Sequence, residues 1–97
     1  METLNFEFPA SKAKARRAHV GVVGSGDLEI LMEPSLDGET RVTIQTSVSG
    51  FADTWKAVIE RFLRQHPEAA NIEIHDFGAT PGTVALRLQQ AVEVSQS

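Results

Sequence analysis

The fold is decided by residues 41–77, which read RVTIQTSVSGFADTWKAVIERFLRQHPEAANIEIHDF. Residues 42, 44, 46 and 48 are Val, Ile, Thr and Val, a period-2 pattern that predicts a half-buried strand over residues 41–48. From residue 51 the apolar period becomes that of a helix, and alternation returns over residues 71–77. The chain is therefore expected to pass here from strand to helix and back to strand.

The predicted helix has recognisable ends. Ser49 suits an N-cap, Asp53 would lie in the first turn, where the helix dipole favours negative charge, and Pro67 would end the helix after His66. One apolar stripe would face the core, formed by Phe51, Trp55, Val58 and Phe62.

Strands are also predicted on the N-terminal side of this unit. Residues 19–23 and 28–33 alternate, and every second residue from Leu28 to Met32 is expected to face the core. Leu4, Phe6 and Phe8 alternate as well, so the beginning of the chain could be a short edge strand or an apolar arm within residues 1–17.

On the C-terminal side, Thr80 followed by Pro81 has the pattern of a helix cap and first helical residue. A second helix is therefore predicted over residues 81–94, and its inner face would be formed by Val84, Leu88, Ala91 and Val92. Because residues 84, 86 and 88 are apolar too, a final strand is the alternative.

These elements predict an α+β fold. The 97 residues would form a single two-layer domain, with a small mixed or antiparallel sheet of about four strands covered on one face by two helices. The short connections between the first three predicted strands, which end at about residue 48, favour an antiparallel meander. The uncovered face, which would carry Thr43, Gln45, Glu73 and His75, could meet solvent or a partner subunit.

Composition excludes several classes of function. The net charge of −4 is mild, cysteine is absent, and no apolar run approaches the length that crosses a bilayer. No secretory signal is evident, so a cytoplasmic location without membrane association is expected. The basic segment Lys12–Arg17 is short and lacks interleaved aromatic residues, which argues against nucleic acid as a partner.

Catalytic and metal sites are not favoured by the spacing of the polar residues. The three histidines are scattered and no pair has the i,i+4 spacing of a helical metal site, so no metal is expected. A triad of Ser25, His75 and Asp76 can be imagined, but the sequence lacks a nucleophile-elbow context and the chain is short for a substrate pocket. The glycine-rich segment 21–26 leads into a strand, whereas phosphate-binding loops open a helix.

The segment Gly24-Ser25-Gly26-Asp27 lies between the two predicted strands that precede residue 34. Glycines tolerate positive φ, so the backbone can reverse tightly there and present the Ser25 side chain at the tip of the turn. An open hydroxyl of this kind suits a residue that another protein must reach and modify. Good turn chemistry alone would account for the same four residues.

Three stretches together resemble the acyl carrier (delta) subunit of bacterial malonate decarboxylases. They are METLNFEFP at residues 1–9, RAHVGVVGSGDLE at residues 17–29 and DFGATPG at residues 76–82. The resemblance implies that Ser25, supported by Gly24 and Gly26, carries phosphoribosyl-dephospho-CoA through a phosphodiester. The citrate lyase carrier subunit uses the same type of group, whereas the Asp-Ser-Leu motif of ordinary fatty-acid carriers is absent here.

The resemblance further implies a non-catalytic subunit of a decarboxylase complex. The terminal thiol of the prosthetic group would hold acetyl, a transferase subunit would exchange acetyl for malonyl, and decarboxylase subunits would remove CO₂. A prosthetic-group transferase would load Ser25 from triphosphoribosyl-dephospho-CoA. The absence of cysteine is compatible with this function, because the thiol would come from the attached group.

Two alternatives belong to other classes of protein. The domain could be an interaction module that docks on a larger enzyme and carries nothing. It could also be a small hydrolase that uses Ser25 as its nucleophile. An adduct of the size of CoA on the intact protein would distinguish the carrier from the interaction module, and turnover of simple esters would favour the hydrolase.

Overall fold

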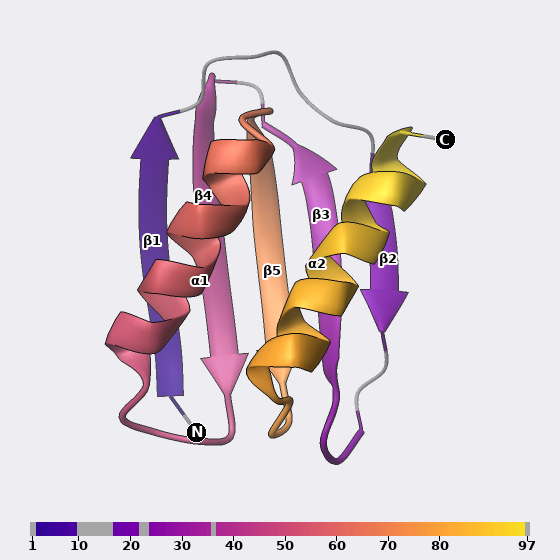
Figure 1. The fold of residues 1–97 in the computed structure, drawn as a ribbon. Helices are drawn as coiled ribbons and strands as arrows, with labels where there is room; N and C mark the ends of the chain where they lie inside the picture. Colours follow the sequence, from indigo (N-terminus) through magenta and orange to yellow (C-terminus); the bar gives the residue numbers. More distant parts are fainter. Residues whose placement is uncertain (1, 10–16, 22–23, 36, 97) are drawn as a thin grey trace.

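The computed structural model describes residues 2–9, 17–21, 24–35 and 37–96. Its elements are β1 (Glu2–Pro9), β2 (Ala18–Gly21), β3 (Leu28–Pro34), β4 (Glu39–Thr46), α1 (Ala52–Gln65), β5 (Ala70–Asp76) and α2 (Pro81–Gln96). Figure 1 shows the strands in one layer and both helices crossing the same face of the sheet. The predicted α+β class, with one helix-covered face, is confirmed.

The strands lie in the order β1-β4-β5-β3-β2. β4 and β5 are parallel and are joined through α1, since a parallel pair needs a crossover connection, and the other neighbouring strands are antiparallel. The meander prediction was wrong at one point, because β5 lies between β3 and β4. Alternation indicates which face of a strand is buried, but not which strand lies beside it.

The sheet has five strands where about four were expected, and the additional strand is β1. Of the two alternatives for the beginning of the chain, the edge strand is the one observed over residues 2–9. The described part of β1 pairs antiparallel with β4 from Glu2 opposite Thr46 to Pro9 opposite Glu39. The basic segment at residues 12–16 lies outside the described residues, while Arg17 forms an ion pair with Glu33 at 3.3 Å.

The core lies between the sheet and the helices. Ile44, Ile74 and Ile30 stand opposite one another on the three central strands, and all three are fully buried. Ile59 of α1 and Leu88 of α2 are buried in the same apolar cluster. Burial of a side chain of this size contributes roughly 1.5–3 kcal/mol, so these central positions hold the two layers together.

Helix α1 begins later than predicted. Its N-cap is Phe51, which makes no side-chain capping bond, and not Ser49. Phe51 was also expected in the core but is 51% exposed, because it lies just before the helix and outside its inner stripe. Trp55 is buried as predicted, Val58 and Phe62 are partly buried, and the helix ends at Gln65, as Pro67 predicted.

Residues 81–96 form a helix and not a strand. The Thr80 hydroxyl accepts a hydrogen bond from the Thr83 amide at 3.2 Å, which is the predicted N-cap. The predicted inner residues are all buried, namely Val84, Leu88, Ala91 and Val92. Leu86, which made the strand alternative possible, is exposed. No helix in the described part of the chain combines the length and apolarity needed to cross a membrane.

The contrast between Trp55 and Phe51 is testable by substitution. Trp55→Ala removes a large buried side chain and is expected to lower the free energy of unfolding by about 3 kcal/mol. Phe51→Ala removes an exposed side chain and is expected to change it by no more than about 0.5 kcal/mol. Urea denaturation of both variants measures these changes, and equal losses would contradict the observed helix start.

Candidate functional site

The turn between β2 and β3 presents Ser25. The Asp27 amide donates to the Gly24 carbonyl at 3.1 Å, which closes a tight turn with Ser25 and Gly26 at its centre. Gly26 has φ of +76°, and a positive φ at the third position of a turn favours glycine. Ser25 is exposed, and its hydroxyl makes no hydrogen bond to another described residue. The structure therefore places the predicted site residue on an open tip.

This turn is attached to the loop that follows β5. The Gly26 amide donates to the Phe77 carbonyl at 2.7 Å, and the Phe77 amide donates to the Asp27 carbonyl at 2.9 Å. These bonds continue the β3–β5 pairing, in which Leu28 stands opposite Asp76, beyond the end of the strands. The base of the turn is thus held by the sheet, although the tip projects from it.

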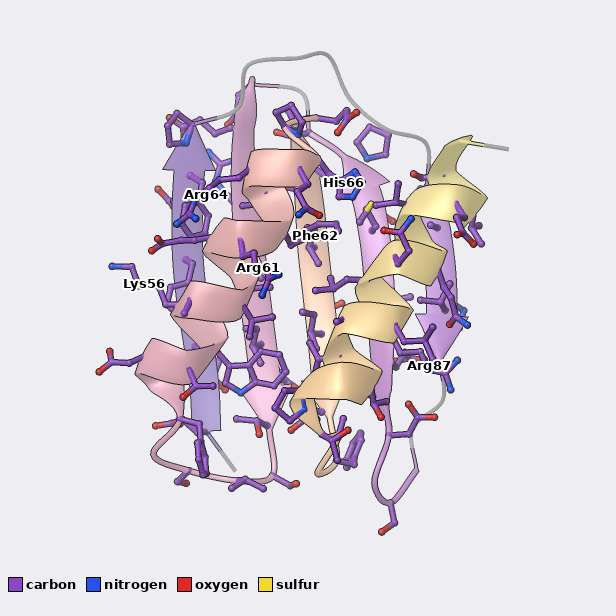
Figure 2. All side chains as sticks on the ribbon, viewed as in Figure 1. Lys56, Arg61, Phe62, Arg64, His66 and Arg87 are labelled. Carbon is purple, nitrogen blue, oxygen red and sulfur yellow. The ribbon has the colours of Figure 1, made fainter. Side chains whose placement is uncertain are left out.

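Helix α2 supplies a second attachment. Arg87 binds the Asp27 carboxylate through both of its oxygens, with Nε–Oδ1 at 3.1 Å and Nη2–Oδ2 at 2.6 Å. Arg87 Nη1 also donates to the Gln90 side chain, which orients the guanidinium. Figure 2 shows Arg87 extending from α2 toward the end of β2 and the β2–β3 turn. Bidentate pairs of this kind fix geometry as well as charge.

The ion pair also decides the charge state of Asp27. The hydrogen bond from Arg87, followed by the bond from the Leu28 amide, lowers the pKa of the Asp27 carboxyl below its usual value. The same contact raises the pKa of Arg87. Since both carboxylate oxygens accept strong hydrogen bonds, Asp27 is engaged in holding the turn.

The connection between β2 and β3 begins with a close backbone contact between Gly21 and Leu28. Gly21 has φ of +85°, and a Cβ added there would collide with the carbonyl oxygen of Leu28. Glycine is therefore required at this position, which is the last residue of β2. From the sequence, Gly21 was assigned to the predicted strand 19–23 and to the glycine-rich segment 21–26, and its close approach to Leu28 was not predicted.

Asp76 organises the neighbouring loop. Its carboxyl group accepts hydrogen bonds from the Thr46 hydroxyl at 2.8 Å and from the Ala79 amide at 3.0 Å. His75 lies on the opposite, uncovered face of the sheet and bonds to Glu29 at 2.8 Å. The imagined relay of Ser25, His75 and Asp76 is therefore not assembled, because neighbouring residues in a strand face opposite sides.

Glu29 joins two of the histidines on the uncovered face. It contacts His75 and His19, each at 2.8 Å, and these hydrogen bonds, that of His75 first, lower the pKa of Glu29. Among the described residues, no group of three or more His, Cys, Asp or Glu side chains is arranged to hold a metal ion.

The comparisons with known proteins agree with one another. Residues 15–95 match the family model of the malonate decarboxylase delta subunit. The chain belongs to this family of acyl carrier proteins. The malonate decarboxylase acyl carrier proteins of Azotobacter vinelandii and Pseudomonas fluorescens are 55% and 56% identical to it over 94 residues, covering 96% of this chain and 95% of each relative.

A solved structure extends the likeness to the fold. The crystal structure of a Pseudomonas malonate decarboxylase hetero-tetramer in complex with malonate contains a chain that is 54% identical, with a TM-score of 0.89. The match covers 96% of this chain and 97% of that one. The family resemblance predicted from the sequence is confirmed: the protein is the acyl carrier protein of malonate decarboxylase, a non-catalytic subunit. An acyl carrier protein implies a prosthetic group.

Sequence reasoning predicted the exposed turn at Ser25 but not the residues that hold this turn in place. Arg87 lies 60 residues from Asp27, and no local pattern connects the two. Asp76 was noted only as part of the family resemblance and of the imagined triad. Its position at the end of a buried strand and two residues before a glycine was the available signal for a loop-organising side chain.

The Asp27–Arg87 pair is expected to contribute to stability in a double-mutant cycle. Arg87→Gln and Asp27→Asn should each lower the urea midpoint, and the double variant should lose less than the sum of the two. Because the pKa of folded Asp27 is lowered, the interaction should be complete above the ordinary value of 3.8 and decline as the pH falls further.

Arg64→Gln is the matched control, since Arg64 is exposed and its ion pair among the described residues is with Glu60 on its own helix, at 4.0 Å. Its midpoint should stay close to that of the unchanged protein. Additive losses for Asp27 and Arg87 between pH 5 and 7 would show that the turn is not held by this pair.

Proposed function

We propose that Ser25 is the attachment residue, and that it carries phosphoribosyl-dephospho-CoA through a phosphodiester. The observation that supports this most is the exposed Ser25 hydroxyl at the tip of a turn whose base is hydrogen-bonded to Phe77. The likeness to the malonate decarboxylase acyl carrier proteins supports the type of group.

The residues around Ser25 fit a bulky phosphodiester. Both sequence neighbours are glycines, so no adjacent side chain blocks the approach of a modifying enzyme. Gly26 is exposed as well, and a Cβ built on it would meet no atom within 4 Å. Space around the hydroxyl is therefore available on the C-terminal side of the serine.

Loading would be a transfer to oxygen. The Ser25 oxygen would attack a phosphorus atom of triphosphoribosyl-dephospho-CoA, a new O–P bond would form, and diphosphate would leave. The hydroxyl proton would pass to a base on the prosthetic-group transferase, because the nearest carboxylate in sequence, Asp27, is bound to Arg87. The carrier thus contributes an accessible nucleophile and no catalysis.

When bound, the group supplies a thiol that holds acetyl or malonyl as a thioester. This chain would present that thiol in turn to a transferase subunit and to decarboxylase subunits in a hetero-tetramer of the kind crystallised from Pseudomonas, in the cytoplasm. A fixed base is useful here because a tethered group visits two active sites at an effective concentration set by the tether.

Intact mass after coexpression with the prosthetic-group transferase tests the attachment residue. The unchanged protein and Ser49→Ala are both expected to gain one adduct, because Ser49 is an exposed serine on a different loop. Ser25→Ala should fold with a free energy of unfolding within roughly 0.5 kcal/mol of the unchanged protein, yet gain nothing. Ser25→Thr keeps a hydroxyl and tests whether the enzyme tolerates a β-methyl group.

Two results would contradict the proposal. Peptide mapping could find the adduct on a serine other than Ser25, or Ser25→Ala could support full malonate decarboxylation with the other subunits. The second result would also favour the alternative of an interaction module that carries nothing.

A further inference from the structure

A groove of about 310 Å³ opens at the end of the molecule that carries Ser25. It lies between the beginnings of α1 and α2 and the carboxyl ends of β4 and β5, which Figure 1 shows at the same end of the sheet as the β2–β3 turn. Most of its wall is apolar, formed by Val48, Phe51, Trp55, Val58, Ala79 and Val84. Its volume is within the range of small-ligand sites, although at the lower end.

The groove adjoins the Ser25 turn directly. Gly78 lines the groove, and a Cβ built on Gly78 would lie 4.0 Å from the Gly26 amide nitrogen. The preceding residue, Phe77, accepts the hydrogen bond of that same amide. A group attached to Ser25 would therefore start beside the wall of the groove.

The rim of the groove exposes apolar surface. Val48 and Phe51 are 42% and 51% exposed, so part of the apolar surface at the rim is uncovered. Leu86 is exposed too, but it lies on α2 outside the groove. The apolar rim and the tether point thus occupy the same end of the protein.

The polar atoms in the wall select against a second negative charge. The Asp76 carboxyl group lines the groove and is occupied by the Thr46 hydroxyl and the Ala79 amide. No buried side-chain nitrogen or oxygen among the described residues lacks a hydrogen-bond partner, so the wall offers no unpaired buried donor to an anion. A neutral apolar ligand fits this wall better than a carboxylate does.

We propose that this groove shelters the acyl end of the arm attached at Ser25 while that end is a free thiol or an acetyl thioester. The malonyl thioester, which carries a free carboxylate, stays outside and remains available to the decarboxylase subunits. This inference rests on the proposed attachment at Ser25.

The groove needs only a weak affinity for the acyl end of the arm to keep that end docked for part of the time. Short flexible tethers give effective concentrations in the millimolar range, so an end group with a millimolar dissociation constant is docked about half of the time. The neutral end then exchanges between the groove and solvent, and acyl transfer is slowed only in proportion to the docked fraction.

The loaded protein offers a clean measurement, because the chain has no cysteine and the arm supplies its only thiol. The rate of alkylation by N-ethylmaleimide would be measured for the loaded protein, for loaded Thr54→Phe and for free CoA. Thr54 is exposed and lines the groove, so phenylalanine there fills the groove from its rim. The unchanged protein is expected to react about two- to threefold more slowly than Thr54→Phe.

Leu86→Phe is the matched control, since it adds an aromatic ring to an exposed position outside the groove, and it should react like the unchanged protein. Trp55, the single tryptophan, lines the groove, so its fluorescence gives an independent measurement of whether the groove is occupied. Its emission should shift to shorter wavelength when the arm is acetylated and return toward the unloaded value when the arm is malonylated.

The inference would be overturned if the unchanged protein and Thr54→Phe were alkylated at equal rates and the emission wavelength of Trp55 were the same with the acetylated and the malonylated arm. A protein that mass spectrometry shows to be loaded on Ser25 would in that case leave the proposed function intact. Absence of any adduct on Ser25 would instead overturn the proposed function, and the sheltered arm with it.

Discussion

The arrangement of this carrier depends on the pairing between the β2–β3 turn and the loop after β5. Two backbone hydrogen bonds join Gly26 and Asp27 to Phe77, and Arg87 binds the Asp27 carboxylate from the helix layer. The first contact fixes the turn to the sheet and the second fixes it to α2. The sheet and the helix layer together therefore fix the position of the turn that exposes Ser25.

This construction separates two tasks. The turn holds Ser25, the proposed attachment residue, in a fixed place. Motion would be left to the attached arm, whose reach would decide which active sites it can visit. The polar groups near Ser25 are engaged in structure: Asp27 with Arg87, and Asp76 with Thr46 and Ala79. This arrangement suits a carrier subunit whose partners perform the chemistry.

Much of the fold could be predicted from the sequence because the relevant signals are local. Period-2 alternation identified the strands, and Thr80 with Pro81 identified the beginning of α2. The insertion of β5 between β3 and β4 could not be predicted, since strand order depends on pairing between distant segments. The prediction that Phe51 lies in the core was wrong because Phe51 continues the helical spacing one residue before the helix begins. Of the site, glycines around a serine predicted the exposed tip, whereas the contact of Arg87 with Asp27 exists only in the folded chain.

Native-state hydrogen exchange of the Gly26 and Phe77 amides tests most directly whether the turn is part of the rigid domain. Both amides donate to backbone carbonyls, at 2.7 and 2.9 Å. If the turn and the sheet open as one cooperative unit, their opening free energies should approach that of Ile74 in the centre of the sheet. Exchange of Gly26 at the rate of an unfolded peptide, while Ile74 stays protected, would contradict a turn at Ser25 that is fixed to the sheet.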